Sequence, residues 1–214
     1  RKADEAGLKV WSCHLPFSRT LDISVLSDSA RMANIGFLTE MIAICGEFEP
    51  KKLVLHPSSE PIADAEREQR ILNSIASIGV LREAAACIGA ELCIEDLPRT
   101  CLGRNSAELL RIIAPYPDVK ICFDTNHLLS EGLLHFVEAC GDRIATVHVS
   151  DYDMIDERHW LPGKGKIDWP ALYRALMKAG YKGVFMYELK RGEGSFSEMV
   201  AIYKRMATDA VKIR

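Results

Sequence analysis

Short apolar runs recur along the chain and alternate with longer segments in which apolar residues return every three or four positions. The short runs are rich in Val, Ile, Leu and Cys, as expected for strands that are buried on both faces. They predict strands over residues 8–13, 52–56, 91–95, 119–124, 144–149 and 184–188. The longer segments predict helices over residues 24–46, 64–89, 105–114, 131–140, 168–179 and 196–211.

The regular alternation of strand and helix favours parallel β-α-β units over a sandwich of two sheets. Six such units are visible in 214 residues, whereas a closed β/α barrel has eight and typically about 250 residues. The chain starts at Arg1, and residues 1–7 resemble the end of a helix that stops at Gly7. We therefore expect an α/β protein, a single (β/α)8 TIM barrel domain over residues 1–214 that lacks its first two β-α units.

Four of the predicted strands end on residues that can bind a divalent metal, namely Glu95, Asp124, His148 and Glu188. Alone, each acidic residue is more often a helix cap or a loop residue. Together they occupy corresponding strand ends, and these ends converge at the mouth of a β/α barrel, where barrel enzymes keep their active sites. Three carboxylates and one imidazole, without a thiolate, favour Mn²⁺, Mg²⁺, Co²⁺ or Fe²⁺ over a structural zinc site. The four residues therefore predict a catalytic metal centre.

Composition narrows the class of partner. The net charge is −3 and the pI is near 6.1, which gives no general attraction to a polyanion, so we expect no nucleic-acid partner. No apolar stretch approaches the roughly 20 residues of a membrane helix, so we expect no membrane association. The seven cysteines are scattered and form no Cys-x-x-Cys pair, which predicts reduced thiols in a cytoplasmic protein. Whether the chain forms a homo-oligomer stays open.

With these residues in place, the chain resembles the xylose-isomerase-like barrels. This superfamily includes sugar and sugar-phosphate isomerases and epimerases, inosose dehydratase and the endonuclease-IV-type repair nucleases. The resemblance extends over essentially the whole chain. It rests on the segments Cys13-His14-Leu15-Pro16, Leu55-His56-Pro57, Ile94-Glu95-Asp96-Leu97-Pro98, Phe123-Asp124-Thr125-Asn126-His127, His148-Val149-Ser150-Asp151, Leu161-Pro162-Gly163-Lys164-Gly165-Lys166-Ile167-Asp168-Trp169 and Tyr187-Glu188-Leu189.

The epimerase-like members imply that Glu95, Asp124, His148 and Glu188 hold one divalent metal ion, which could be Mn²⁺, Mg²⁺, Co²⁺, Fe²⁺ or Zn²⁺. They also imply that Glu95 and Glu188 act as acid and base on a small carbohydrate substrate. A metal at the carbonyl stabilises the enediolate that forms when a neighbouring proton is removed. Two carboxylates on opposite faces can then exchange that proton, which gives epimerisation or, between adjacent carbons, isomerisation.

Three further histidines are candidates for substrate contacts. His127 follows Asp124 by three residues, and the resemblance implies that it binds a substrate hydroxyl; otherwise it caps the following helix. His14 and His56 end the first two predicted strands, where they contact substrate or pack as buried polar groups.

The region after His148 offers three candidates whose roles the sequence leaves open. Lys164, within Gly163-Lys164-Gly165-Lys166, binds a phosphate or lies in a solvated turn. His159 lines the edge of the pocket or belongs to a surface loop. Asp151 touches substrate or pairs with a lysine.

The leading interpretation is a metal-dependent isomerase or epimerase of a sugar, sugar phosphate or keto-polyol. The alternatives are a dehydratase acting on a compound such as inosose or dehydroshikimate, a repair nuclease, and a non-catalytic carbohydrate-binding barrel. The nuclease needs additional metals and an Asp-x-His pair after His148, which residues 153–159 lack. Two departures weaken transfer of a ketohexose 3-epimerase activity: Met154 replaces a usual arginine, and Asp96 replaces a common asparagine and is expected to add negative charge.

Overall fold

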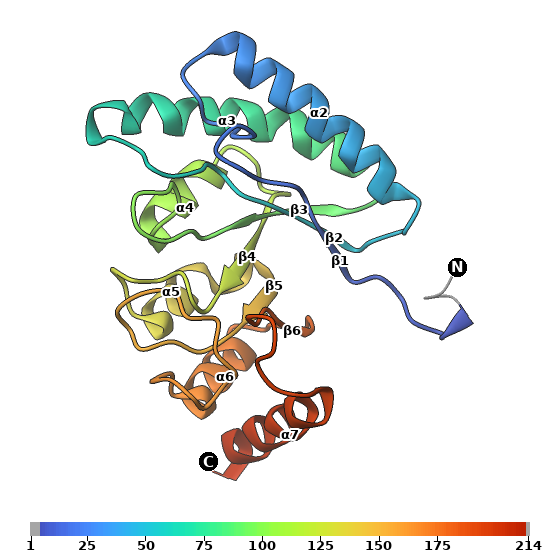
Figure 1. The fold of residues 1–214 in the computed structure, drawn as a ribbon, viewed down its shortest axis with the longest axis vertical. Helices are drawn as coiled ribbons and strands as arrows, with labels where there is room; N and C mark the ends of the chain where they lie inside the picture. The colour runs from blue at the N-terminus through green and yellow to red at the C-terminus, as the bar shows by residue number, and fades with distance from the viewer. Residues whose placement is uncertain (1–4, 213–214) are drawn as a thin grey trace.

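The computed structural model describes residues 5–212 (Figure 1). Six parallel strands form one sheet and follow one another in chain order. The strands are β1 (Ser12–His14), β2 (Lys52–Leu55), β3 (Glu91–Glu95), β4 (Lys120–Asp124), β5 (Ile144–Val149) and β6 (Phe185–Tyr187). The helices are α2 (Asp28–Gly46), α3 (Asp64–Cys87), α4 (Ser106–Ile113), α5 (Leu133–Cys140), α6 (Trp169–Lys178) and α7 (Phe196–Lys212), with the 3-10 turn η1 (Gly141–Arg143).

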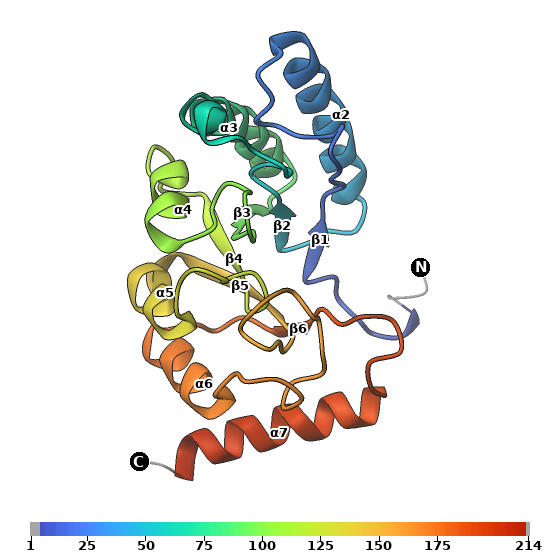
Figure 2. The same ribbon diagram turned by 60° about the vertical axis from the view of Figure 1, so that its left-hand side comes forward.

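The helices lie on one side of the sheet, and Figure 2 shows the strands inside an arc of helices. Each of the first five strands is followed by a helix that returns the chain to the start of the next strand, and α7 follows β6. This arrangement is that of an open β/α barrel, with six strands where a closed TIM barrel has eight. The fold class expected from the sequence is confirmed.

The strands place alternate side chains on opposite faces of the sheet. On β3, Leu92 and Ile94 face the helices and belong to the main hydrophobic core. The residues between them face the barrel interior, so Cys93 and Glu95 lie on the same inner face. A small inner cluster consists of Val54, Cys93 and Cys122. Small apolar side chains thus form the floor of the barrel, and ionisable residues stand above them at the strand ends.

The first strand is shorter than the sequence predicted. Residues 8–13 were expected to be extended, but β1 begins only at Ser12, where its pairing with Lys52 of β2 starts. The predicted helix end at residues 1–7 begins among residues 1–4, which lie outside the described residues. Gly7 has a φ of 67°, the left-handed conformation that commonly ends a helix.

Helix α2 starts four residues later than the predicted start at residue 24. Ser27 caps the helix, since its hydroxyl oxygen accepts a hydrogen bond from the Ala30 amide at 3.4 Å. Ser24 makes different contacts, because its hydroxyl donates to Asp22 and accepts from Arg70 of α3. This polar network competes with helix formation and delays the start of α2.

A buried ion pair joins the loops that follow β1 and β2 to α3. Asp22 and Arg70 are only 3% and 8% exposed, and Arg70 Nη2 donates to Asp22 Oδ2 at 2.5 Å. The Asp22 carboxylate also accepts hydrogen bonds from the amides of Ser24 at 2.7 Å and Ser59 at 2.8 Å. The pair therefore fixes two of the loops that surround the mouth of the barrel.

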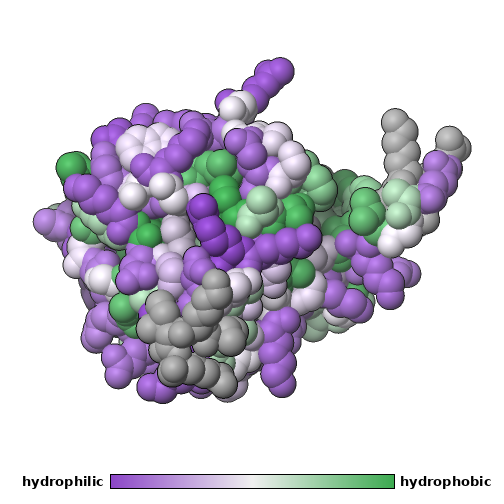
Figure 3. Space-filling view, turned by 90° about the horizontal axis from the view of Figure 1, so that it is seen from below, coloured by the Kyte–Doolittle hydropathy of each residue, from purple (hydrophilic) through white to green (hydrophobic). Residues whose placement is uncertain are grey.

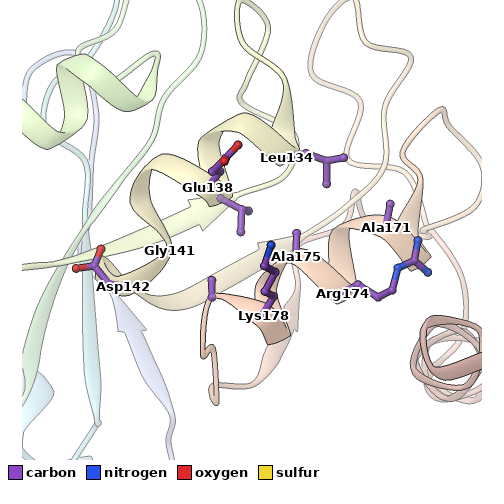
Figure 4. A pocket seen from close by; sticks show the side chains of 10 residues that line it. Leu134, Glu138, Gly141, Asp142, Ala171, Arg174, Ala175 and Lys178 are labelled. Carbon is purple, nitrogen blue, oxygen red and sulfur yellow. The ribbon is translucent and has the colours of Figure 1, made fainter. Parts of the chain in front are cut away.

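The outer surface of the molecule has a groove between two helices. A groove of about 660 Å³ runs between α5 and α6, lined by residues that include Glu138, Asp142, Arg174 and Lys178 (Figure 4). These helices lie outside the sheet, so the groove is separate from the strand ends.

The face in Figure 3 is mostly hydrophilic around a central apolar patch. Among the described residues, no helix is long and apolar enough to cross a membrane.

Replacing Arg70 by leucine should leave the Asp22 carboxylate buried without its partner. We expect the free energy of unfolding in urea to fall by about 3–5 kcal/mol. The matched control is Arg111→Leu, because Arg111 pairs with Glu68 on the exposed surface, where ion pairs contribute little. Equal losses in the two variants would show that the Asp22 pair does not hold the loops.

The cysteines should differ sharply in reactivity toward Ellman's reagent. All seven are unpaired in the described part of the chain, and Cys93, Cys101, Cys122 and Cys140 are buried. Burial raises the pKa of Cys93 to about 12, so that the thiol stays protonated and unreactive. The exposed Cys87 should react first in the native protein, and the four buried thiols only after unfolding. Peptide mapping by mass spectrometry checks this order, and a disulfide found under non-reducing conditions would contradict it.

Candidate metal centre

The four strand-end residues predicted as metal ligands converge on one point. Each offers a ligand atom, and these atoms all lie within 4.8 Å of one another. His148 Nδ1 is 2.7 Å from Glu95 Oε1, 2.7 Å from Glu188 Oε2 and 3.8 Å from Asp124 Oδ2. The convergence follows from the strands, because Asp124 pairs with His148 in the register of β4 and β5. Their roles as ligands, acid and base stay predictions.

The oxygen and nitrogen atoms that meet in this cluster suit the coordination of a divalent cation. His148 Nδ1 carries at most one proton, and it donates to Glu95. Glu188 Oε2 is equally near but lies outside the direction of a hydrogen bond, and neither it nor Asp124 Oδ2 has a hydrogen-bond partner among the described residues. Unpartnered buried carboxylate oxygens are costly, and a cation between them would remove that cost.

Glu95 is the member of the cluster with the most side-chain contacts. Its side chain is 1% exposed, and its Oε2 lies 3.0 Å from Nε2 of both His14 and His56. Burial alone would raise the pKa of Glu95, but the charge of His148 and the hydrogen bonds from the three imidazoles hold it well below its usual range. The structure thus places His14 and His56 directly beside the predicted metal centre.

The carboxylates of Asp124 and Glu188 have opposite pKa shifts. Burial raises the pKa of Asp124 to about 7, and the like charges of Glu188 and Glu95 add to this effect. Burial would also raise the pKa of Glu188, but the adjacent His148 imidazole lowers it to about 2. Glu188, whose side chain is 41% exposed, is therefore ionised at neutral pH and open to a ligand.

Cys122 is a neighbour of this centre that sequence reasoning did not include. Its Sγ lies within 4.8 Å of ligand atoms of Glu95 and His148. Burial raises the pKa of the Cys122 thiol well above its usual range, which favours the neutral thiol over the metal-binding thiolate. The inward position of Cys122 at the pairing partner of Glu95 could have indicated this proximity.

A second cluster forms from His127, Glu157 and His159, whose ligand atoms also lie within 4.8 Å of one another. Glu157 was missed by the sequence analysis. Residues 153–159 contain no Asp-x-His pair, as the sequence analysis stated, but Glu157 and His159 form a Glu-x-His pair that meets His127 in space. The signal was present in Glu157-Arg158-His159, with glutamate in place of the expected aspartate.

Burial disfavours the negative charge that the sequence analysis expected of Asp96. The residue is fully buried, and its Oδ1 accepts a hydrogen bond from the Asp124 amide at 2.7 Å. Burial raises the pKa of Asp96 well above its usual range, and the nearby Asp124 raises it further. A neutral carboxylic acid has one acceptor and one donor, so it resembles the asparagine side chain it replaces.

Two predicted site residues lie apart from these clusters. Asp151 is fully buried, and its carboxylate accepts hydrogen bonds from the amides of Tyr152, Gly163 and Ile167 and from Trp169 Nε1. Through these hydrogen bonds, Asp151 stabilises the loop to which it belongs. Lys164 donates to Glu193 Oε2 at 2.7 Å on the surface.

A cavity of about 380 Å³ opens beside the four predicted metal ligands and includes Glu188 in its wall. Its wall includes His56, His127, His159 and Glu188, four of the predicted site residues. Phe17 also lines it, with its ring 3.9 Å from the ring of His56 between centroids. Sequence reasoning did not select Phe17, although it follows His14 closely at the end of β1. An aromatic face and several polar groups suit a small polar ligand.

Comparison with known proteins places the chain in one family. The family model described as xylose isomerase-like TIM barrel matches residues 1–206. An uncharacterised protein of Methanocaldococcus jannaschii is 27% identical over 186 residues, which are 83% of this chain and 63% of that protein. Fructoselysine 3-epimerase of Escherichia coli O157:H7 is 24% identical over 175 residues, covering 78% of this chain and 57% of the enzyme. The chain thus spans about 60% of the length of these two relatives.

A solved structure of similar fold is that of a D-tagatose 3-epimerase-like protein. It superposes with a TM-score of 0.87 at 23% identity, and the match covers 99% of this chain and 81% of that one. At this identity the likeness shows the fold. It agrees with the open barrel seen in Figure 2.

The raised pKa of Asp96 predicts a pH-dependent effect of Asp96→Asn. Above the unfolded pKa of about 3.9, the folded state binds a proton that the unfolded state releases, so this group's contribution to stability falls as the pH rises toward its folded pKa. Asparagine has no titratable proton, so the variant does not lose stability in this way as the pH rises. The stability of the variant relative to wild type should therefore increase from pH 4.5 upward. Urea denaturation of chelator-treated protein at several pH values tests this, and a constant difference would contradict it.

Proposed function

Because the chain belongs to the xylose isomerase-like TIM barrel family, we propose that it is a divalent-metal-dependent sugar isomerase or epimerase. The observation that carries the proposal is the convergence of Glu95, Asp124, His148 and Glu188 at the strand ends. The similarity to fructoselysine 3-epimerase and to a D-tagatose 3-epimerase-like structure supports the same class of reaction.

In this proposal the four residues hold one divalent ion at the mouth of the barrel. Such an ion supplies Lewis-acid stabilisation of the negative charge that develops on a carbonyl oxygen. Among the candidate ions, Mn²⁺, Co²⁺, Mg²⁺ and Fe²⁺ suit a set of three carboxylates and one imidazole.

Glu188 and Glu95 divide the proton transfers. Glu188 faces the cavity, is ionised at neutral pH and so accepts the proton next to the substrate carbonyl. Glu95 approaches His148 Nδ1 at 2.7 Å, as Glu188 does, and is the candidate to exchange the proton on the other face. His56 and His127 line the cavity and can hydrogen-bond substrate hydroxyls, which fixes the orientation that the transfer needs.

Phosphodiester cleavage is a second candidate. The Glu157-x-His159 pair stands in the region where a repair nuclease needs an Asp-x-His pair, and His14 and His56 beside Glu95 form another group that could hold a metal. The net charge of −3 still disfavours a nucleic-acid substrate.

Replacing Glu188 by glutamine should separate proton transfer from metal binding. The amide oxygen can still coordinate, so metal affinity should be largely kept, while turnover of the active ketose or keto-polyol falls by about 100-fold or more. Asp124→Asn is the comparison variant, and it should weaken metal binding first and recover part of its activity at high Mn²⁺. A Glu188→Gln variant with wild-type turnover would exclude Glu188 as the base.

The mechanism itself is tested by hydrogen exchange. Wild-type protein with Mn²⁺ should exchange the substrate's α-hydrogen with D₂O, or show a primary isotope effect with α-deuterated substrate if the base is shielded from solvent. NMR follows the exchange across a panel of ketoses and inososes, and loss of a hydroxyl from the product would identify a dehydratase. Cleavage of an abasic-site duplex without any exchange would replace the proposal by the nuclease candidate.

A further inference from the structure

The cavity beside the four predicted metal ligands extends well beyond them. Its wall reaches from Glu188, which follows the last strand β6, to residues 17–19 in the loop after β1 and residues 58–60 in the loop after β2. Strands β1 and β2 are neighbours at one edge of the sheet, and β6 lies at the other edge. A ligand that fills the cavity therefore contacts the loops after β1 and β2 as well as the predicted metal ligands.

Two arginines line this cavity, and their surroundings differ. The charge of Arg99 is compensated, because its guanidinium pairs with Glu60, Asp156 and Glu157. Arg19 is exposed and has no ion pair or side-chain hydrogen bond within the described part of the chain. The protein thus leaves one positive charge at the cavity wall without a partner of its own.

The carboxylates of the cavity wall are already engaged elsewhere. Glu60 and Glu157 pair with Arg99. Glu188 lies 2.7 Å from an imidazole nitrogen of the predicted metal ligands. All three carboxylates share the wall with Arg19, yet none of them pairs with it. A guanidinium in this situation is available to an anionic group of the ligand, with which it forms charge-assisted hydrogen bonds.

The backbone around Arg19 is held in a defined turn. The Leu21 amide donates to the carbonyl oxygen of Ser18 at 3.1 Å and to its hydroxyl oxygen at 3.0 Å. These hydrogen bonds close a turn whose two central residues are Arg19 and Thr20. Asp22, the residue after this turn, belongs to the buried ion pair that fixes the loop. The Arg19 side chain therefore extends from a fixed backbone beside the cavity.

The loop after β2 adds a neutral donor to the same wall. The Ser59 amide donates to Asp22 Oδ2 at 2.8 Å, so one buried carboxylate fixes both loops. The Ser59 hydroxyl has no hydrogen-bond partner among the residues that the structure describes. A hydroxyl can donate to an anionic oxygen, so Ser59 suits the same kind of ligand group as Arg19.

Phe17 links this part of the wall to the predicted metal ligands. Its ring stacks on His56 at 3.9 Å between centroids, and His56 Nε2 lies 3.0 Å from Glu95. Arg19 follows Phe17 by two residues in the same wall. A carbon chain can therefore pass over an aromatic surface between the predicted metal ligands and the arginine. This arrangement suits an elongated polar ligand with a charged end.

We propose that the substrate carries an anionic group, a phosphate or a carboxylate, at the end of its carbon chain far from the reacting carbonyl, and that Arg19 binds this group. The planar guanidinium matches either anion with two parallel hydrogen bonds. The Ser59 hydroxyl supplies a further donor. This inference rests on the proposed function and narrows its substrate class from sugars and keto-polyols to their anionic derivatives.

The binding of three polyols to the Mn²⁺-loaded protein tests the inference. The probes are glucitol, glucitol 6-phosphate and gluconate, which have no ketone or aldehyde group, so calorimetry measures binding without turnover. At least one of the two anionic probes should bind about 10-fold or more tightly than glucitol. Arg19→Gln should remove this advantage and leave the affinity for glucitol unchanged, whereas Arg19→Lys should keep part of it. The anionic probe with the advantage identifies the group as phosphate or carboxylate.

Arg104→Gln is the matched control. Arg104 lies in the loop after β3 at the same end of the barrel and also has no ion pair among the described residues, but it is outside the wall of this cavity. This variant should keep the preference for the anionic probe. Circular dichroism establishes that each variant folds.

Three results would overturn the inference. The first is that neither anionic probe binds wild type more tightly than glucitol. The second is that the advantage persists in Arg19→Gln, as it would if the anionic group bound the metal ion and Arg19 were only a solvated surface residue. The third is that Arg104→Gln loses the advantage to the same extent, which would indicate a general effect of positive charge.

Failure of this inference differs from failure of the proposed function. A protein that exchanges the α-hydrogen of a neutral ketose with D₂O but shows no preference for the anionic probes refutes the inference alone. A protein that binds an anionic probe through Arg19 but exchanges no α-hydrogen contradicts the proposed function and retains the anion site. With an active anionic substrate, Arg19→Gln should raise KM and leave kcat largely unchanged, because the distant charge does not change during proton transfer.

Discussion

The site depends on one buried carboxylate, Glu95, and on the need to compensate its charge. An isolated carboxylate in a protein interior is unfavourable by several kcal/mol, so the surrounding chain must supply donors or a cation. Glu95 is 1% exposed and has imidazoles from the ends of three other strands, namely His14, His56 and His148, within 3.0 Å. These contacts tie β3 to β1, β2 and β5 at one end of the sheet. The cluster around Glu95 therefore also contributes to holding the open barrel together at its mouth.

The sequence predicted the residues that are placed by strand geometry. Glu95 and Asp124 end their strands, and His148 is the last residue but one of β5. Alternation and parallel register leave a single direction for each of these side chains, so reading the strand suffices to place them. The helix and strand order followed from the same periodicity. The boundaries were less well predicted where a tertiary contact overrode local preference, as where Ser24 joins the Asp22–Arg70 network and α2 starts only at Asp28.

The residues whose surroundings the sequence did not predict belong to loops or depend on burial. Glu157 reaches His127 only because the loop after β5 folds back over the mouth, and no periodic pattern encodes that path. Asp151 shows the opposite case. Its carboxylate suggested a substrate contact, but it organises the segment up to Trp169 through four hydrogen bonds. Asp96 suggested an added charge, yet its complete burial favours the neutral acid. Each outcome depends on a distance or a degree of burial that residue identity does not contain.

The loops around the mouth are held by interactions that do not involve the side chains of Glu95, Asp124, His148 and Glu188. Asp22 with Arg70 fixes the loops after β1 and β2, and Asp151 fixes the loop after β5. Arg99 links that loop to Glu60, because it pairs with both Asp156 and Glu60. Carboxylates can then be held close together although they repel one another, because the scaffold prevents them from moving apart. The raised pKa of Asp124 is a direct consequence of this confinement, since burial and its charged neighbours disfavour a further negative charge. A cation that binds there would meet side chains that are already in place. Its binding would relieve the repulsion between the carboxylates, and no binding energy would be needed to order the loops.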